Sequence, residues 1–131
     1  MEILVPVDPV ARACKYLGGF GLGKVAGAVP DGWAWDGPLV VVKGAGGGGE
    51  YSRVLADERL TVEASAPARG EASLLARRTL ALLRAWQDRE GGVYWRGPVG
   101  AVTYWPDDET GTPLYQFTVA LAFRAQRELI A

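Results

Sequence analysis

Two segments of the chain repeat apolar residues at the three- and four-residue spacing of an amphipathic helix. The first is Pro9–Leu17, with Asp8 as its N-cap and Gly18 as its stop. The second covers residues 71–86 and carries the longer apolar stripe. The pattern therefore predicts two helices that each bury one face. The expected core positions are Val10, Ala13, Cys14, Leu17, Ala72, Leu75, Ala76, Thr79, Leu82, Leu83 and Trp86.

Other segments show the patterns of β-strands. Residues 39–42 form a β-branched run between glycines, which is typical of a buried strand. Residues 59–66 and Leu114–Arg124 alternate apolar and polar positions, which predicts strands with one face toward the core. Two further short strands are expected at residues 93–95 and 101–105.

Glycine, proline and polar residues mark the connections. Residues 20–37 predict a structured connection in which Trp33 and Trp35 pack as a short strand. The glycine run at residues 44–49 predicts a flexible hairpin loop, because its backbone entropy is high. Residues 106–113 form a polar turn between two strands.

This order of elements predicts one α+β domain over residues 1–131. We expect a mixed, mainly antiparallel β-sheet packed on one face by two α-helices. The strand that begins at Leu114 should run antiparallel to its neighbour across the polar turn.

Composition removes several classes of function. The net charge of -1 argues against specific nucleic-acid binding, which needs a broad positive field. The chain has no histidine and one cysteine, which excludes Ser-His-Asp and Cys-His triads, histidine zinc sites and internal disulfides. No apolar run approaches the roughly 18 residues of a membrane span, so no membrane partner is expected.

The motifs that invite a chemical interpretation are weak. Residues 18–24 match the G-x-x-x-x-G-K spacing of a phosphate-binding loop, but Val25 stands where a hydroxyl must bind magnesium. The glycines also follow a helix, where the motif requires a strand. The acidic run Asp107, Asp108 and Glu109 is better explained as a solvated turn than as a cation site. We therefore expect no catalysis and no cofactor.

Two sets of residues are candidates for contacts with another protein. Arg77 and Arg78 contribute to a basic stretch on the second predicted helix, which is either a solvated face or a dock for an acidic surface. Trp95 and Trp105 make the C-terminal sheet rich in aromatic residues, which are common in cores and at interfaces.

Four segments resemble the tail terminator, or tail completion, proteins of long-tailed phages, especially the branch found in phages of GC-rich actinobacteria. The most specific is the turn and strand in the last of them. The segments are residues 38–44 (PLVVVKG), 54–63 (VLADERLTVE), 70–77 (GEASLLAR) and 106–121 (PDDETGTPLYQFTVAL). Residues 18–27 and the pair Trp33 and Trp35 match no position of that family.

The resemblance implies a structural virion protein at the tail-neck junction, assembled in the host cytoplasm. Its copies would form a ring, a hexamer in that family, on the last ring of tail tube protein. The ring would end tail elongation and present a surface to the head-side connector. The glycine loop, with Gly46, Gly47 and Gly48, is then a candidate for ordering against a neighbour. The alternatives are a head-completion stopper or adaptor of the phage neck, and a small nucleotide-binding domain or enzyme built on residues 18–24.

Overall fold

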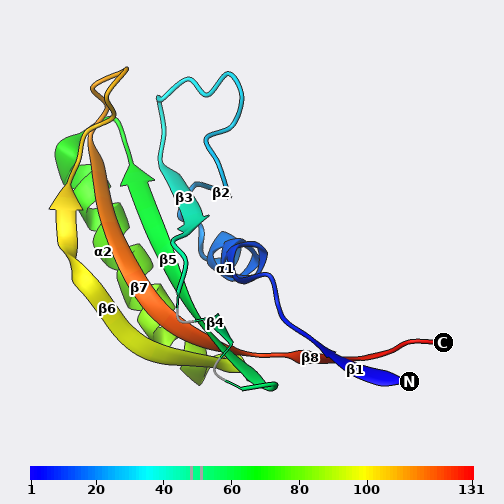
Figure 1. The fold of residues 1–131 in the computed structure, drawn as a ribbon. Helices are drawn as coiled ribbons and strands as arrows, with labels where there is room; N and C mark the ends of the chain where they lie inside the picture. Colours follow the sequence, from blue (N-terminus) through cyan, green and yellow to red (C-terminus); the bar gives the residue numbers. More distant parts are fainter. Residues whose placement is uncertain (48, 51) are drawn as a thin grey trace.

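A six-stranded sheet with two helices on one face forms the body of the protein in the computed structural model, which describes residues 1–47, 49–50 and 52–131 (Figure 1). The strand order is β2-β3-β5-β7-β6, and β4 pairs with β5. Only β2 and β3 run parallel within this described sheet. The fold is the predicted α+β class. The strands are β2 (Lys24–Ala26), β3 (Leu39–Gly44), β4 (Gly49–Glu50), β5 (Leu55–Ser65), β6 (Val93–Tyr104) and β7 (Leu114–Arg124).

The two helices lie close to their predicted positions. Helix α1 is Pro9–Leu17, and the Asp8 carboxylate accepts a hydrogen bond of 3.1 Å from the Ala11 N–H as its N-cap. Helix α2 is Arg69–Ala85, so it begins slightly before the predicted residue 71. Each helix passes into a 3-10 turn, η1 (Gly18–Phe20) after α1 and η2 (Trp86–Asp88) after α2.

The core lies between the helices and the sheet and is centred on Trp86, which is fully buried. Tyr16 of α1 stacks on Trp86 with ring centroids 4.7 Å apart, and Phe123 of β7 meets Trp86 edge-on at 5.6 Å. The Tyr16 hydroxyl donates to the Leu82 carbonyl at 2.6 Å. This aromatic group joins both helices to the sheet. Cys14 packs half-buried beside it, and burial raises the pKa of its thiol.

The face of the sheet that points away from the helices carries polar residues on β5 and β7, whereas Leu39 and Val41 of β3 lie on this face and are buried. Thr61 and Thr118, directly opposite each other on β5 and β7, share a hydrogen bond of 2.8 Å. Lys43 and Glu63 form an ion pair of 2.8 Å between β3 and β5. The alternate β5 side chains, such as Leu60, enter the core. The predicted alternation over residues 59–66 is therefore confirmed.

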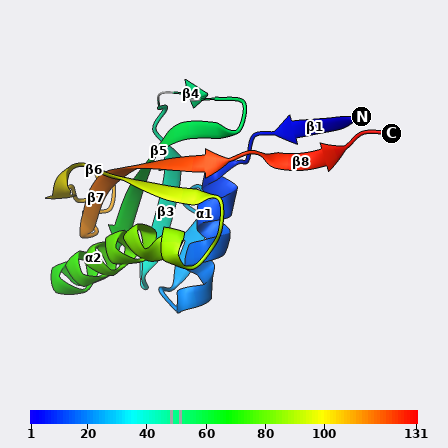
Figure 2. The same ribbon diagram turned by 90° about the horizontal axis from the view of Figure 1, so that it is seen from below.

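The two ends of the chain form a separate two-stranded sheet that was not predicted. Strands β1 (Glu2–Val5) and β8 (Gln126–Leu129) pair antiparallel, and we call them the terminal ribbon. The Met1 and Ile130 backbones are also joined by hydrogen bonds of 2.7 and 2.8 Å. Figures 1 and 2 show the ribbon projecting from the body beyond the N-terminal end of α1.

Two local predictions were wrong. Residues 93–95 and 101–105 do not form two strands, because β6 is continuous across them. It shifts register twice against β7, and Gly97 and Gly100 adopt positive φ there, so bulges bend the strand without ending it. Trp33 and Trp35 lie outside any strand, and Trp35 has a φ of 58° that is incompatible with one.

Candidate assembly surfaces

The glycine loop is tied to β5 along its first half. The Ala45 N–H donates to the Arg59 carbonyl and the Arg59 N–H donates to Gly46, each at 2.8 Å. A Cβ on Gly47 would lie 2.8 Å from the Asp57 carbonyl oxygen, so the backbone fits there only as glycine. Gly46 and Gly47 are exposed and remain candidates for contacts, whereas the candidate Gly48 lies outside the described residues.

Arg77 and Arg78 are both exposed on α2, but they belong to different surfaces. Consecutive helical residues point about 100° apart, so neighbours in sequence do not share a face. Arg77 borders a shallow hollow with Arg84, whereas Arg78 lines a larger groove on the side of η1. Arg89 lies over the Phe20 ring at 5.2 Å. The basic residues therefore form no single patch.

Trp95 lies near the start of β6 and Trp105 directly follows its end, and the two differ in exposure. Trp95 is half-buried against the core, with the Arg84 guanidinium 5.4 Å from its ring, and its backbone N–H donates to Gln87 at 2.9 Å. Trp105 is 60% exposed at the start of the β6-β7 turn. The structure therefore makes Trp105 the better contact residue and gives Trp95 a packing role.

Trp105 adjoins an aromatic group at the start of α2, and together they form what we call the hairpin-end surface. Tyr104 and Tyr115 lie 5.1 Å apart, and the Arg69 guanidinium stacks 3.9 Å over the Tyr104 ring. Arg69 also donates to the Tyr115 hydroxyl at 3.0 Å, and this bond raises the pKa of Arg69. In Figure 1 this end of the molecule lies opposite the terminal ribbon.

The acidic turn beside this surface is held by its own side chains. The Asp107 carboxylate accepts hydrogen bonds from the Thr110 N–H at 2.8 Å, the Thr110 hydroxyl at 2.9 Å and the Glu109 N–H at 3.2 Å. The bonds from Thr110, then that from Glu109, lower the pKa of Asp107. The carboxylate therefore acts as a turn cap, as the interpretation of a solvated turn requires.

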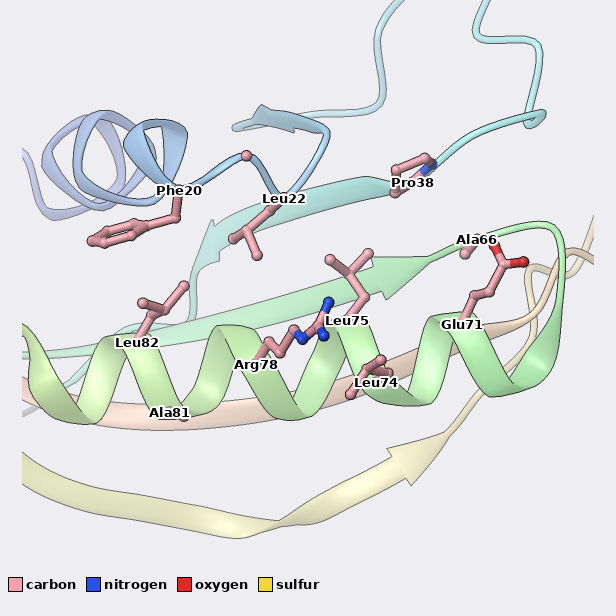
Figure 3. Close-up of a pocket in the computed structure, with 11 residues that line it drawn as sticks. Phe20, Leu22, Pro38, Ala66, Glu71, Leu74, Leu75, Arg78, Ala81 and Leu82 are labelled. Carbon is pink, nitrogen blue, oxygen red and sulfur yellow. The ribbon is translucent and has the colours of Figure 1, made fainter.

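A groove of about 630 Å³ lies between α2 and the chain that follows α1 (Figure 3). We call it the α2 groove. Its walls are mainly apolar, and Leu74 is 37% exposed there. Glu71 and Arg78 are its two charged residues. The remaining lining includes Phe20, Leu22, Pro38, Leu75, Ala81 and Leu82.

The terminal ribbon has one face that is more apolar than the other. Residues directly opposite each other in an antiparallel pair point to the same face. The register pairs Ile3 with Glu128 and Val5 with Gln126, and Met1 bonds Ile130 at the end of the same series. We call this the Ile3 face of the ribbon. The other face carries Glu2, Leu4, Arg127 and Leu129.

Sequence reasoning missed both the terminal ribbon and the α2 groove. Residues 1–5 and 126–130 each contain apolar residues outside the predicted helices, but nothing local indicates that the two segments pair. The groove joins α2 to residues 20–22 and 38, whose approach depends on the tertiary fold. The available sequence signal for the groove was Leu74, an apolar residue of α2 that lies outside the predicted core stripe and is exposed in the structure.

No family model matches this chain, and the comparison with curated proteins gives no match either. Neither helix of the described residues has the length and apolar character needed to cross a membrane. Among residues 1–47, 49–50 and 52–131, acidic and cysteine side chains form no cluster able to hold a metal ion. The surfaces described above are suited to binding through apolar, aromatic and charged contacts.

Proposed function

We infer that this protein is a tail terminator of a long-tailed phage. In this role its copies form a ring on the last ring of tail tube protein, at the tail-neck junction. The ring ends tail elongation and offers a joining surface to the head-side connector. The protein would perform this role through contacts with other proteins, without a chemical reaction or a cofactor.

One observation carries the proposal beyond the sequence resemblance itself. The segments that resemble tail terminators correspond to β3, most of β5, the first half of α2, and the turn with β7. Strands β3, β5 and β7 are consecutive neighbours in the sheet, and α2 contacts both β5 and β7. Segments far apart in the sequence thus form one continuous body. This is expected when a resemblance reflects a shared fold.

The distribution of exposed apolar residues also supports a subunit that makes several contacts. The hairpin-end surface carries Trp105 at 60% exposure, and the terminal ribbon carries Met1 and Leu129 at 79% each. These surfaces lie at opposite ends of the molecule (Figure 1). A ring subunit that joins a tube to a connector needs contacts with neighbouring copies as well as with the tube and the connector, and exposed aromatic residues are frequent at such contacts.

The experiment is electron microscopy of a phage lysate in which the Trp33 codon is replaced by a stop codon. A tail terminator predicts overlong tails without attached heads, because the tube no longer stops growing. Wild-type protein supplied from a plasmid must restore normal tail length and head joining. This rescue controls for effects of the stop codon on neighbouring genes.

The same lysate distinguishes the alternative role. Tails of normal length beside unjoined or emptied heads would contradict tail termination and indicate a head-completion stopper or adaptor. Virions of unchanged appearance would contradict both roles.

A further inference from the structure

We propose that the Ile3 face of the terminal ribbon docks into the α2 groove of a second copy of this chain, so that copies associate head to tail. The inference rests on the proposed ring and names the contact that builds it. Its elements are a projecting apolar ribbon, a mainly apolar groove, and one pair of oppositely charged side chains, Glu128 of the ribbon and Arg78 of the groove.

The ribbon has the properties of a docking element. It has only two strands, and an isolated two-stranded ribbon is marginally stable in water. Its Ile3 face presents Met1 at 79% and Ile130 at 38% exposure beside Ile3 and Val5. Placing this face on an apolar surface removes that area from water, which favours association.

The α2 groove is a suitable receptor in size and chemistry. Its volume of about 630 Å³ lies within the range of sites that bury several apolar groups. In Figure 3 Leu75 and Leu82 of α2 point toward the side of the groove that carries Leu22 and Phe20. The groove therefore accepts apolar side chains of the kind that the Ile3 face presents.

One acidic and one basic side chain are available to pair across the contact. The Ile3 face carries one charged side chain, Glu128, beside the Met1 ammonium, and the groove wall carries Arg78 midway along α2. Glu128 and Arg78 make no ion pair with another described residue of their own chain. Glu71, the acidic residue of the groove, lies nearer the start of α2 than Arg78 does. A Glu128 carboxylate paired with Arg78 is therefore kept apart from the Glu71 carboxylate, which limits the repulsion between the two. The pair sets the direction of docking.

The fold prevents the ribbon from reaching the groove of its own chain. The ribbon joins α1 at its N-terminal end, whereas the groove borders residues 20–22, beyond the C-terminal end of α1. Nine residues of helix separate these ends by about 13 Å, and the ribbon points away from the body (Figure 2). The contact must form between copies. Because its two surfaces differ, the contact is heterologous, and repeated heterologous contacts form a ring when the rotation between copies closes.

The test is sedimentation of the purified protein at concentrations up to about 1 mM, where a contact with a Kd near 1 mM is detectable. The wild type should associate with increasing concentration. Ile3→Glu should weaken association at least about tenfold, since it places a charge in an apolar contact. Leu4→Glu, on the opposite ribbon face, is the matched control and should change the dissociation constant by less than about threefold.

The groove is tested in the same way. Arg78→Glu should weaken association at least about tenfold, whereas Arg77→Glu, its neighbour outside the groove, should not. Adding Glu128→Arg to Arg78→Glu should restore association. Circular dichroism and thermal unfolding check that each variant is folded, which is expected because these residues lie outside the core.

A mixture of two defective variants tests the head-to-tail geometry. Ile3→Glu keeps a normal groove and Arg78→Glu keeps a normal ribbon, so a mixture should form dimers and nothing larger. A monomeric wild type, variants that associate normally, absence of the mixed dimer, or failure of the charge exchange to restore association would each overturn the proposed contact. These outcomes leave the tail-length experiment unaffected, so failure of the contact and failure of the tail terminator role are separately visible.

Discussion

Trp86, which directly follows α2, is fully buried against α1 and β7, whereas Leu129 at the end of the terminal ribbon is 79% exposed. Both residues are large and apolar, but their surroundings differ. Strands of the body pair with long neighbours and are covered by helices, while the ribbon strands pair only with each other among the described strands. The packing of the body therefore accounts for the folding stability of the protein. The apolar surface of the ribbon remains available for association.

Removal of the Trp86 side chain is expected to cause the largest loss of folding stability. Trp86→Ala leaves a cavity among Tyr16, Phe123 and the helices, and should lower the free energy of unfolding by about 3–5 kcal/mol. Trp105→Ala, on the exposed tryptophan, should change it by less than about 0.5 kcal/mol. Urea unfolding measures both. Similar losses for the two variants would contradict the assignment of Trp86 to the centre of the core.

A smaller loss of folding stability is expected from a substitution in the glycine loop, where it lies against β5. Gly47→Ala places a methyl group 2.8 Å from the Asp57 carbonyl, so the loop must move away, at a cost of about 1–3 kcal/mol. Gly44→Ala is the control, since its nearest neighbour would be Val10 at 3.8 Å. Urea unfolding of the two variants should separate them. Equal stability would show that the loop is not held against β5.

The acidic turn gives a smaller, pH-dependent effect. The pKa of Asp107 is lowered in the folded state, so its hydrogen bonds stabilise the fold above the ordinary value of 3.8 and are lost as pH falls through the lowered pKa. Because the carboxylate is exposed and screened by solvent, Asp107→Asn should cost less than about 1 kcal/mol at pH 7. The difference in stability from wild type should shrink as the pH falls below the ordinary pKa of 3.8 and through the lowered pKa of Asp107.

Chemical unfolding at neutral and acidic pH measures this difference. Asp108→Asn, on the same turn, controls for the loss of a charge. An Asp107→Asn deficit that grows as the pH falls would contradict the capping role of the carboxylate.

The smallest effect on stability is expected in the terminal ribbon. Leu129→Asp should change the free energy of unfolding by less than about 0.5 kcal/mol, since the side chain is exposed and lies outside the body. Hydrogen exchange should also show faster opening of β1 and β8 than of β5 in monomeric protein. A loss comparable to that of Trp86→Ala would remove the distinction between body and ribbon.

The same distinction explains which elements could be predicted from the sequence. Helix α1 is marked by Asp8 and Pro9, and β7 by clean alternation, so local patterns identified both. Strand β6 was predicted as two separate strands. Its two bulges contain glycines at positive φ, and in a sequence such glycines are indistinguishable from those that end a strand. The terminal ribbon pairs residues near 2 with residues near 129, and no local pattern records such a pairing.

The candidate contact residues divide in a similar way. Trp105 proved exposed and Trp95 half-buried, which the aromatic content of the C-terminal sheet could not distinguish. The separation of Arg77 from Arg78 follows from helical geometry and was accessible from the sequence. The α2 groove was not, because Pro38 and Leu22 reach it only through the tertiary fold.

The central claim, that this protein caps the tail tube, is tested most directly by its position in the phage particle. Antibody to the purified protein, with gold-labelled secondary antibody, should mark the head-proximal end of the tail in intact virions. It should mark the same end on tails of normal length that carry no head, because a terminator joins the tube before the head does. Label on tailless heads, at the distal tail tip, or on no particle at all would contradict the account.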